Sequence, residues 1–165
     1  MLVKMFKKLD ERGLIKHASA HCDIPCGIYD TGPALIAAVS VVRLMDILSE
    51  AKSENDVALA NVRTRAVLTK EVEAEKVKHE IRIIWGDYFK PPLIEKHPEV
   101  HTLVHSIMMK ASACKQDLHR EDGLALVELV NQFAEIFWET KGVATYRAVC
   151  PYAPKLEVVY PKLDA

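Results

Sequence analysis

Four segments with apolar residues at helical spacing constrain the fold of this chain more than any other feature of its sequence. The segments are residues 33–51, residues 53–86, a stretch that opens at Pro98, and residues 121–141. In the first of them, Val41, Leu44, Met45 and Leu48 fall at positions i, i+3, i+4 and i+7, which is typical of an amphipathic helix. Four such helices with short connections predict an all-α fold, an antiparallel four-helix bundle over residues 33–141.

Local signals set the expected ends of these helices. Ser53 begins a weak S-x-x-D signal for the start of the second helix, and the charged residues within 70–78 predict a solvated face. Gly86 and the Pro91-Pro92 pair predict that this helix breaks in the sequence GDYFKPP. The second helix is therefore expected to end near Gly86.

Composition limits the classes of protein to which the chain can belong. Its 165 residues argue for one domain, and half of them are hydrophobic, which is enough for a buried core. The net charge of −1 gives no basic excess for a nucleic-acid partner. No run of about 18 apolar residues is present, so we expect no membrane-spanning helix. Four cysteines are too few for a disulfide scaffold, which favours reduced thiols in the cytoplasm.

Residues 1–20 differ from the rest of the chain. They carry five basic and two acidic residues and end in Ala18-Ser19-Ala20, which is similar to a small-residue cleavage site. Their middle, KKLDERGLIK, is charged, whereas a secretory signal needs an apolar core there. The segment is either a disordered N-terminal arm or a leader that is removed inside the cell.

The C-terminal residues 142–165 also change in character. They contain three of the eight prolines and three of the five tyrosines. This composition predicts an extended C-terminal tail that packs through its aromatic residues, with a short strand possible from Leu156 to Tyr160.

The residues that could carry chemistry are concentrated in 21–32, which begin HCDIPCGIYD and which we call the hook. Cys22 and Cys26 are separated by three residues, not by the two of most zinc knuckles and redox motifs. The pair is therefore a chance pair of thiols, a redox site or part of a metal site.

Cleavage after Ala20 would favour a metal site. His21 would then offer a free amine beside its imidazole, and Cys22 would offer an amide nitrogen and a thiolate. Together with the thiolate of Cys26, these donors suit a square-planar N₂S₂ site, with the imidazole of His21 left as a fifth, axial ligand. Square-planar geometry indicates Ni(II) or Cu(II), and thiolates beside Cu(II) tend to be oxidised, which favours nickel.

The hook resembles that of the nickel superoxide dismutase family, whose mature chains begin His-Cys-Asp-x-Pro-Cys-Gly-x-Tyr. Three further segments strengthen the resemblance, which covers residues 21–141. They are WGDYFKPP at 85–92, EKHPEVHTLV at 95–104 and IFWETK at 136–141.

The resemblance implies a four-helix bundle, a homohexamer and a leader, residues 1–20, that a protease removes before activity. It implies the reaction 2 O₂⁻ + 2 H⁺ → O₂ + H₂O₂, with one nickel per chain cycling between Ni(II) and Ni(III). The implied ligands are the amine and imidazole of His21, the backbone nitrogen and sulfur of Cys22, and the sulfur of Cys26. A cis bond before Pro25 is implied as well, at the small cost that X-Pro bonds allow.

Residues around the metal are also implied by the resemblance. Tyr29 and Tyr88 match family tyrosines that border the approach of substrate and order water. Asp23 and backbone amides are expected to hold the shape of the hook, and Lys90 is placed to attract an anion.

One departure from the family concerns the axial imidazole. The type member of the family holds it with a Glu and an Arg, and alignment puts Ala37 and Glu73 at those positions. We expect Glu73 to take over as the acceptor for the ring of His21.

The other candidate ligands have plainer interpretations. His97, His101 and His105 could line one helix face as ligands, but we expect a loop residue in His97 and surface or core residues in the others. Cys114 and Cys150 are expected to be ordinary thiols.

Two alternatives to a superoxide dismutase remain at this point. One is a helical protein with a non-catalytic hook that binds zinc or acts as a redox switch, and the other is a plain bundle that binds a partner through its tail.

Overall fold

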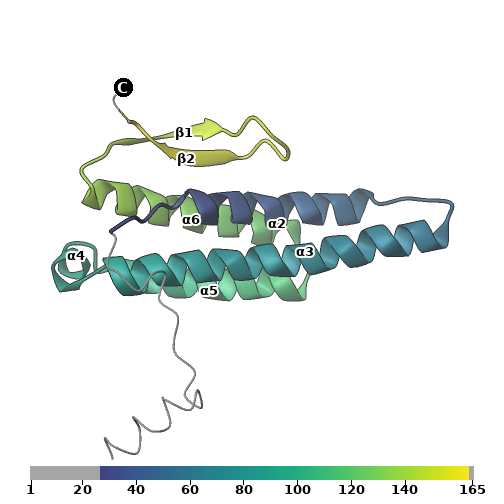
Figure 1. Cartoon of the computed structure of the whole chain (residues 1–165), viewed down its shortest axis with the longest axis horizontal. Coiled ribbons are helices and arrows are strands. Elements are labelled where there is room, and N and C mark those ends of the chain that lie inside the picture. Colours follow the sequence, from purple (N-terminus) through teal and green to yellow (C-terminus); the bar gives the residue numbers. More distant parts are fainter. Residues whose placement is uncertain (1–26, 164–165) are drawn as a thin grey trace, which may run out of the picture.

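The computed structural model describes residues 27–163 of the chain (Figure 1). Its elements are α2 (Gly32–Glu50), α3 (Asp56–Ile83), the π-helical turn η1 (Ile84–Tyr88), α4 (Pro91–Lys96), α5 (Val100–Gln116), α6 (Arg120–Thr140), β1 (Thr145–Val149) and β2 (Glu157–Pro161). The helical bundle predicted from the sequence is confirmed, with long helices close to their expected bounds.

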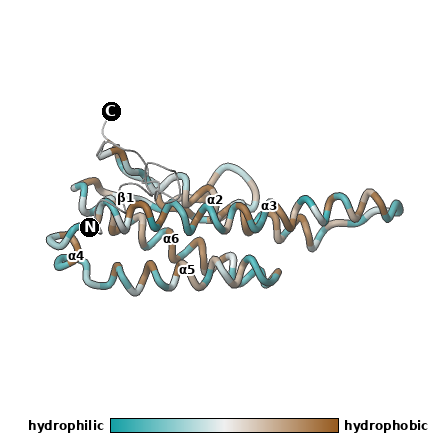
Figure 2. Tube along the Cα trace, turned by 60° about the horizontal axis from the view of Figure 1, so that its bottom comes forward, coloured by the Kyte–Doolittle hydropathy of each residue, from teal (hydrophilic) through white to brown (hydrophobic). Residues whose placement is uncertain are grey.

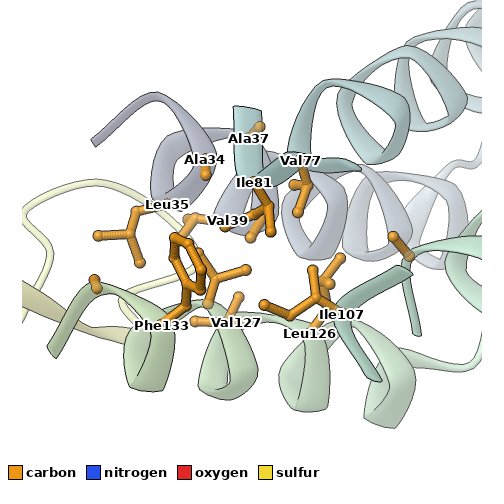
Figure 3. Packing of buried hydrophobic residues seen from close by; sticks show 14 of the residues in the cluster. Ala34, Leu35, Ala37, Val39, Val77, Ile81, Ile107, Leu126, Val127 and Phe133 are labelled. Carbon is orange, nitrogen blue, oxygen red and sulfur yellow. The ribbon is translucent and has the colours of Figure 1, made fainter. Parts of the chain in front are cut away.

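The four long helices of the described residues form a closed bundle. Helix α2 packs against α3 and α6, and α5 packs against the same two helices, so each helix has two neighbours. Chain direction alternates around the bundle (Figure 1). Figure 3 shows the core, where Ile81 of α3, Ile107 of α5 and Leu126 of α6 meet side chains of α2.

Helices α2 and α6 approach one another closely because a glycine lies between them. A Cβ atom at Gly123 would stand 2.9 Å from a methyl carbon of Val42 and 3.1 Å from the sulfur of Met45. Any larger residue at position 123 would push the two helices apart, so this glycine serves packing.

The start of α3 differs from the prediction. The helix begins at Asp56, and the side chain of Asn55 accepts hydrogen bonds from the backbone N–H groups of Val57 and Ala58, both at 3.0 Å. Asn55 therefore caps the helix, and Ser53 instead accepts from the backbone N–H of Asn55 at 3.1 Å.

The predicted end of this helix within GDYFKPP is confirmed, two residues later than Gly86. The helix passes through Gly86 as the π-helical turn η1 and ends at Tyr88. Two prolines then begin α4, because the first turn of a helix does not need their missing N–H groups. The next helix, α5, starts at Val100 rather than at the predicted Pro98.

The expectation that the charged face of α3 is solvated fails at Lys70, whose exposed fraction is 1%. Its ammonium donates hydrogen bonds to the carbonyl oxygens of Cys114, Lys115 and Asp117 at the end of α5. Burial lowers the pKa of Lys70, and the carbonyl ends of α5 provide the acceptors that a buried ammonium needs.

The prediction of an extended C-terminal tail is also wrong, because β1 and β2 pair as an antiparallel hairpin with Tyr146 opposite Tyr160. The strand expected at Leu156–Tyr160 is present, shifted by one residue, and β1 is the partner that the sequence did not reveal. The hairpin lies over α6 and beside α2 (Figure 1), and it buries Val158 and Val159 against the bundle.

Helix α2 is the most apolar of the long helices. It is the one helix of the described residues that is long and apolar enough to cross a membrane, and 50% of its apolar window is buried inside the bundle. A buried helix in the core of a protein often has this composition. Figure 2 shows the hydropathy along the chain, with the N-terminal part of α3 extending beyond α5 and α6.

Candidate metal centre

Five of the predicted site residues lie outside the described part of the chain: His21, Cys22, Asp23, Pro25 and Cys26. The leader predicted over residues 1–20 lies outside it as well. The description begins at Gly27, the residue that directly follows the second cysteine of the hook, so the structure shows where the hook joins the bundle.

The residues at this junction are held by the beginning of α2 and the end of α3. Gly27 has a φ of +69°, a left-handed conformation that strains any residue with a side chain, so the turn after Cys26 requires glycine. The carboxylate of Asp30 accepts a hydrogen bond from the backbone N–H of Gly32 at 2.6 Å. This bond satisfies one of the free donors at the start of α2 and ties the junction to that helix.

The junction also packs against α3. Ile28, Tyr29 and Asp30 line a small pocket of about 210 Å³ together with Glu80 and Ile83 at the end of α3. The residues that directly follow the predicted metal-binding segment therefore pack at the end of α3 that continues into η1.

Tyr29 and Tyr88, the two tyrosines predicted to border the site, are brought together here. Their ring centroids are 5.7 Å apart and the rings are tilted by 50°. The hydroxyl groups of Tyr88 and Thr140 are hydrogen-bonded at 2.7 Å, which fixes the phenol against the end of α6. Two residues that are distant in the sequence thus form one aromatic pair, and one of them, Tyr29, is three residues after Cys26.

The surroundings of Tyr88 include residues to which the sequence analysis gave no role. The ring of Phe137 lies 5.1 Å from that of Tyr88, and the ammonium of Lys141 lies 4.5 Å from the centroid of the Tyr88 ring. Such a cation–π contact holds a positive charge on one face of the phenol. The segment IFWETK contains Phe137, Thr140 and Lys141, so this motif was the signal that pointed to them.

Lys90 lies after Tyr88, between η1 and α4, and is exposed. Its ammonium lies 3.4 Å from the carbonyl oxygen of Gly86 in η1, which is a weak contact. The ammonium of Lys141 lies over the ring of Tyr88, and Lys90 follows Tyr88 by two residues in the chain. Positive charge at a site attracts a small anion.

Glu73 lies elsewhere on α3. It is seven residues before Glu80, about 10 Å along the helix axis. Its carboxylate makes no hydrogen bond or ion pair within residues 27–163, and it lines a pocket between α2, α3 and the tip of the hairpin. Ala37 is fully buried in the core, so that position offers no polar group.

The three histidines of the predicted helix face have separate environments. His97 is buried, its Nδ1 lies 3.5 Å from the carboxylate of Glu99, and its Nε2 has no hydrogen-bond partner. His101 accepts a hydrogen bond from the indole of Trp85 at 3.0 Å, and His105 is exposed. Within residues 27–163, no three His, Cys, Asp or Glu side chains are arranged to hold a metal.

Both cysteines of the described residues are buried and free. Burial raises the pKa of Cys114 to about 11, so its thiol stays protonated at neutral pH. The thiol of Cys150 lies 3.4 Å from the carbonyl oxygen of Tyr152 within the hairpin tip.

Comparison with known proteins identifies the family. The sequence model of the nickel-containing superoxide dismutases matches residues 16–141. A superoxide dismutase [Ni] from Streptomyces coelicolor is 42% identical over 123 residues, which are 74% of this chain and 89% of the relative, and one from Streptomyces seoulensis matches to the same extent. The chain belongs to the nickel-containing superoxide dismutase family.

Solved structures agree with this assignment. A native nickel superoxide dismutase structure has a TM-score of 0.66 and 39% identity, and the match covers 73% of this chain and 99% of that one. A structure with the nickel ligation of the oxidised state has a TM-score of 0.67 and 38% identity, over 74% of this chain and 99% of the other. The predicted family, enzyme class and nickel cofactor are thereby confirmed.

The family match ends at Lys141, and the hairpin that follows lies beyond it. The matches to the two solved structures cover 99% of each solved chain but less than three quarters of this chain. The hairpin is therefore an addition to the part of the chain shared with those relatives.

The residues present suit nickel. The hook supplies thiols and an imidazole directly before Gly27, and thiolate and nitrogen donors are those that Ni(II) accepts in a square-planar site.

Proposed function

We propose that this superoxide dismutase holds one nickel ion per chain on His21, Cys22 and Cys26, after residues 1–20 have been removed. The amine and imidazole of His21, the backbone nitrogen and thiolate of Cys22 and the thiolate of Cys26 would be the ligands. The observation that carries this proposal is the pair of Tyr29 and Tyr88 beside the junction at which the hook leaves the bundle.

Nickel held by anionic sulfur and nitrogen donors supplies the redox couple Ni(II)/Ni(III), which exchanges one electron with each superoxide. Residues of the chain attract the substrate and hold the surroundings of the metal in place. Lys90 and Lys141 raise the local concentration of the anionic substrate, and Tyr29 and Tyr88 border its approach. The bond from Tyr88 to Thr140 keeps the phenol in place, while Phe137 closes the space behind it.

Three further residues would shape the metal site. Asp23 and Pro25 would fix the turn of the hook, and Glu73 would accept a hydrogen bond from the imidazole of His21. The lack of any partner for Glu73 among residues 27–163 supports that role, since a carboxylate oriented into a pocket favours a donor.

We propose that the active form is a homohexamer. Four large apolar side chains of α3 are exposed: Val57, Val62, Leu68 and Val72. Several exposed apolar residues along one helix are typical of a contact surface between subunits.

We place the enzyme in the cytoplasm, where a protease removes the leader. The charged middle of residues 1–20 argues against export. The net charge of −1 and the burial of half of α2 support a protein without nucleic-acid or membrane partners. Membership of the family disfavours the alternative of a non-catalytic zinc-binding or redox-switched hook.

The test is metal analysis of a chain that starts at His21. We expect about one nickel per chain with thiolate-to-nickel absorption, and we expect Cys26→Ser to lose both while keeping its helical circular dichroism. Cys114→Ala is the matched control, because that buried thiol lies in α5 and lacks any role in the proposed ligand set. Zinc in place of nickel, or a reversible disulfide without metal, would refute the proposal.

A further inference from the structure

The hydroxyl group of Thr140 takes part in two hydrogen bonds at the end of α6. Its Oγ1 lies 2.6 Å from the carbonyl oxygen of Phe137 and 2.7 Å from the hydroxyl oxygen of Tyr88. A threonine hydroxyl has one proton, so it donates in one of these bonds and accepts in the other. The direction of the two bonds therefore decides on which side the phenol of Tyr88 carries its proton.

The bond to Phe137 fixes this direction. A carbonyl oxygen only accepts, so Thr140 is the donor there. The last turn of α6 makes that carbonyl available, because the N–H of Lys141 donates to the carbonyl oxygen of Trp138 at 3.0 Å instead of reaching back four residues. Since the one proton of Thr140 is used in this way, its oxygen accepts from Tyr88, and the phenol is the donor.

The ring of Tyr88 is held in place from several sides. The rings of Phe89 and Phe137 pack against it edge to face, with centroids 5.4 and 5.1 Å from its own. The ammonium of Lys141 lies 4.5 Å from the centroid of the Tyr88 ring. The ring therefore cannot follow a ligand, and any turn of the phenol proton away from Thr140 breaks the bond of 2.7 Å.

Tyr88 consequently presents a hydrogen-bond acceptor to a molecule that approaches it. A hydroxyl has one proton and two lone pairs, and with the proton directed at Thr140 the lone pairs remain. Superoxide is an anion that carries no hydrogen, so it has nothing to donate to these lone pairs. Water and hydrogen peroxide both carry O–H donors and match this group.

We propose that Thr140 is a positioning residue of this superoxide dismutase, which fixes Tyr88 as a hydrogen-bond acceptor for water and for the peroxide product. Tyr88 is then neither a proton donor in the formation of hydrogen peroxide nor a direct hydrogen-bond partner of superoxide. Attraction of the anion is left to ammonium groups such as that of Lys141. The inference rests on the proposed function, in which Tyr88 borders the approach of substrate.

Ultraviolet resonance Raman spectroscopy of the nickel-free full chain tests the direction of the bond. In the tyrosine Fermi doublet, the ratio of the higher-frequency to the lower-frequency band rises as a phenol loses its role as a donor. We expect this ratio to rise in Thr140→Val and to stay unchanged in Thr140→Ser, which keeps the hydroxyl. A ratio that falls or stays the same in Thr140→Val would overturn the proposal.

Inhibition by azide tests the consequence in the nickel-loaded chain that starts at His21. In Thr140→Val the O–H of Tyr88 is released to donate to an anion. Azide should therefore inhibit this variant about tenfold more strongly, at the lower end of what a hydrogen bond to a charged group contributes. Thr140→Ser should be inhibited like the natural chain. A role in packing alone would reverse this order, because serine lacks the methyl group that valine keeps.

Two controls separate this effect from a general loss of structure. Thr69→Val removes the same kind of bond on α3, where the hydroxyl of Thr69 donates to the carbonyl oxygen of Arg65 at 2.8 Å, and azide inhibition should not change. Thr140→Val combined with Tyr88→Phe should show no increase over Tyr88→Phe alone, because the phenol O–H is missing in both.

Equal inhibition of Thr140→Val and the natural chain, or an increase that persists with Tyr88→Phe, would overturn the proposal. A chain that starts at His21 and takes up no nickel would instead refute the proposed ligand set. The Raman measurement needs no nickel, so it decides the direction of the bond in either case.

Discussion

Replacement of Asn131 by leucine should release the C-terminal hairpin from the bundle. Asn131 is 1% exposed, and its amide group makes two hydrogen bonds to the backbone of β2, at 2.9 and 3.0 Å. Leucine has a similar volume, so the change removes the hydrogen bonds with little change in packing.

The two bonds contribute unequally. The N–H of Val159 would lose its partner in a residue that is 2% exposed, and an unsatisfied buried donor costs about 1–3 kcal/mol. The carbonyl of Glu157, an exposed residue, can bind water instead, so its loss costs less. We expect a total of about 2–3 kcal/mol, which lowers the stability of the docked hairpin more than that of the helices.

Hydrogen exchange at the amide of Val159 is the assay. A loss of about 2–3 kcal/mol corresponds to exchange about 30-fold to 150-fold faster, while amides in the middle of α3 should change little. Gln132→Leu is the matched control on α6, since Gln132 is exposed and bonds only to the nearby carboxylate of Glu128. Unchanged exchange at Val159 in Asn131→Leu would refute this account of how the hairpin is held.

Three further predictions concern the metal centre, each for the chain that starts at His21. His21→Gln should still bind nickel but lose most activity, because the axial donor to Ni(III) is gone; normal turnover would contradict the ligand assignment. Glu73→Gln should change the electron paramagnetic resonance signal of Ni(III) if Glu73 accepts from the imidazole, and an identical spectrum would exclude that role. Lys90→Ala should lower the rate with superoxide at low ionic strength and flatten its dependence on salt, with nickel content unchanged. Lys141→Ala is the comparison: it should do the same and also loosen Tyr88, and a salt dependence equal to that of the natural chain in both variants would exclude steering.

The helices were predictable because their apolar residues repeat at the helical period, a property that is local in the sequence. Their ends were less so. Both Ser53 and Asn55 are good caps, and only the backbone path shows that Asn55 faces the free N–H groups of α3. At Gly86 the sequence contains a helix breaker, yet packing of Trp85 and Tyr88 keeps the backbone helical.

Features that depend on distant parts of the chain were not predictable. Lys70 belongs to a charged stretch, and nothing local shows that its ammonium reaches carbonyl groups at the end of α5. The hairpin forms because β1 finds β2 and because Asn131 of α6 pairs with the edge of β2. For residues 142–165, the sequence therefore indicated the strand that became β2 but not its partner β1.

The candidate site was also predictable only in part. The donor types that cleavage after Ala20 would provide in the hook indicated square-planar metal chemistry, and the motif around Tyr88 came with the family resemblance. The contacts of Tyr88 with Thr140 and Lys141, and the proximity of the hairpin tip to Glu73, needed the structure.

The most direct test of the central claim compares the uncut chain with the chain that starts at His21. In the uncut chain the nitrogen of His21 is an amide bonded to Ala20, so it is not available as an amine ligand. The account predicts that both chains fold, that only the shortened chain binds about one nickel and dismutates superoxide, and that one extra residue before His21 largely prevents both. An uncut chain that binds nickel and removes superoxide as fast as the shortened one would contradict the claim.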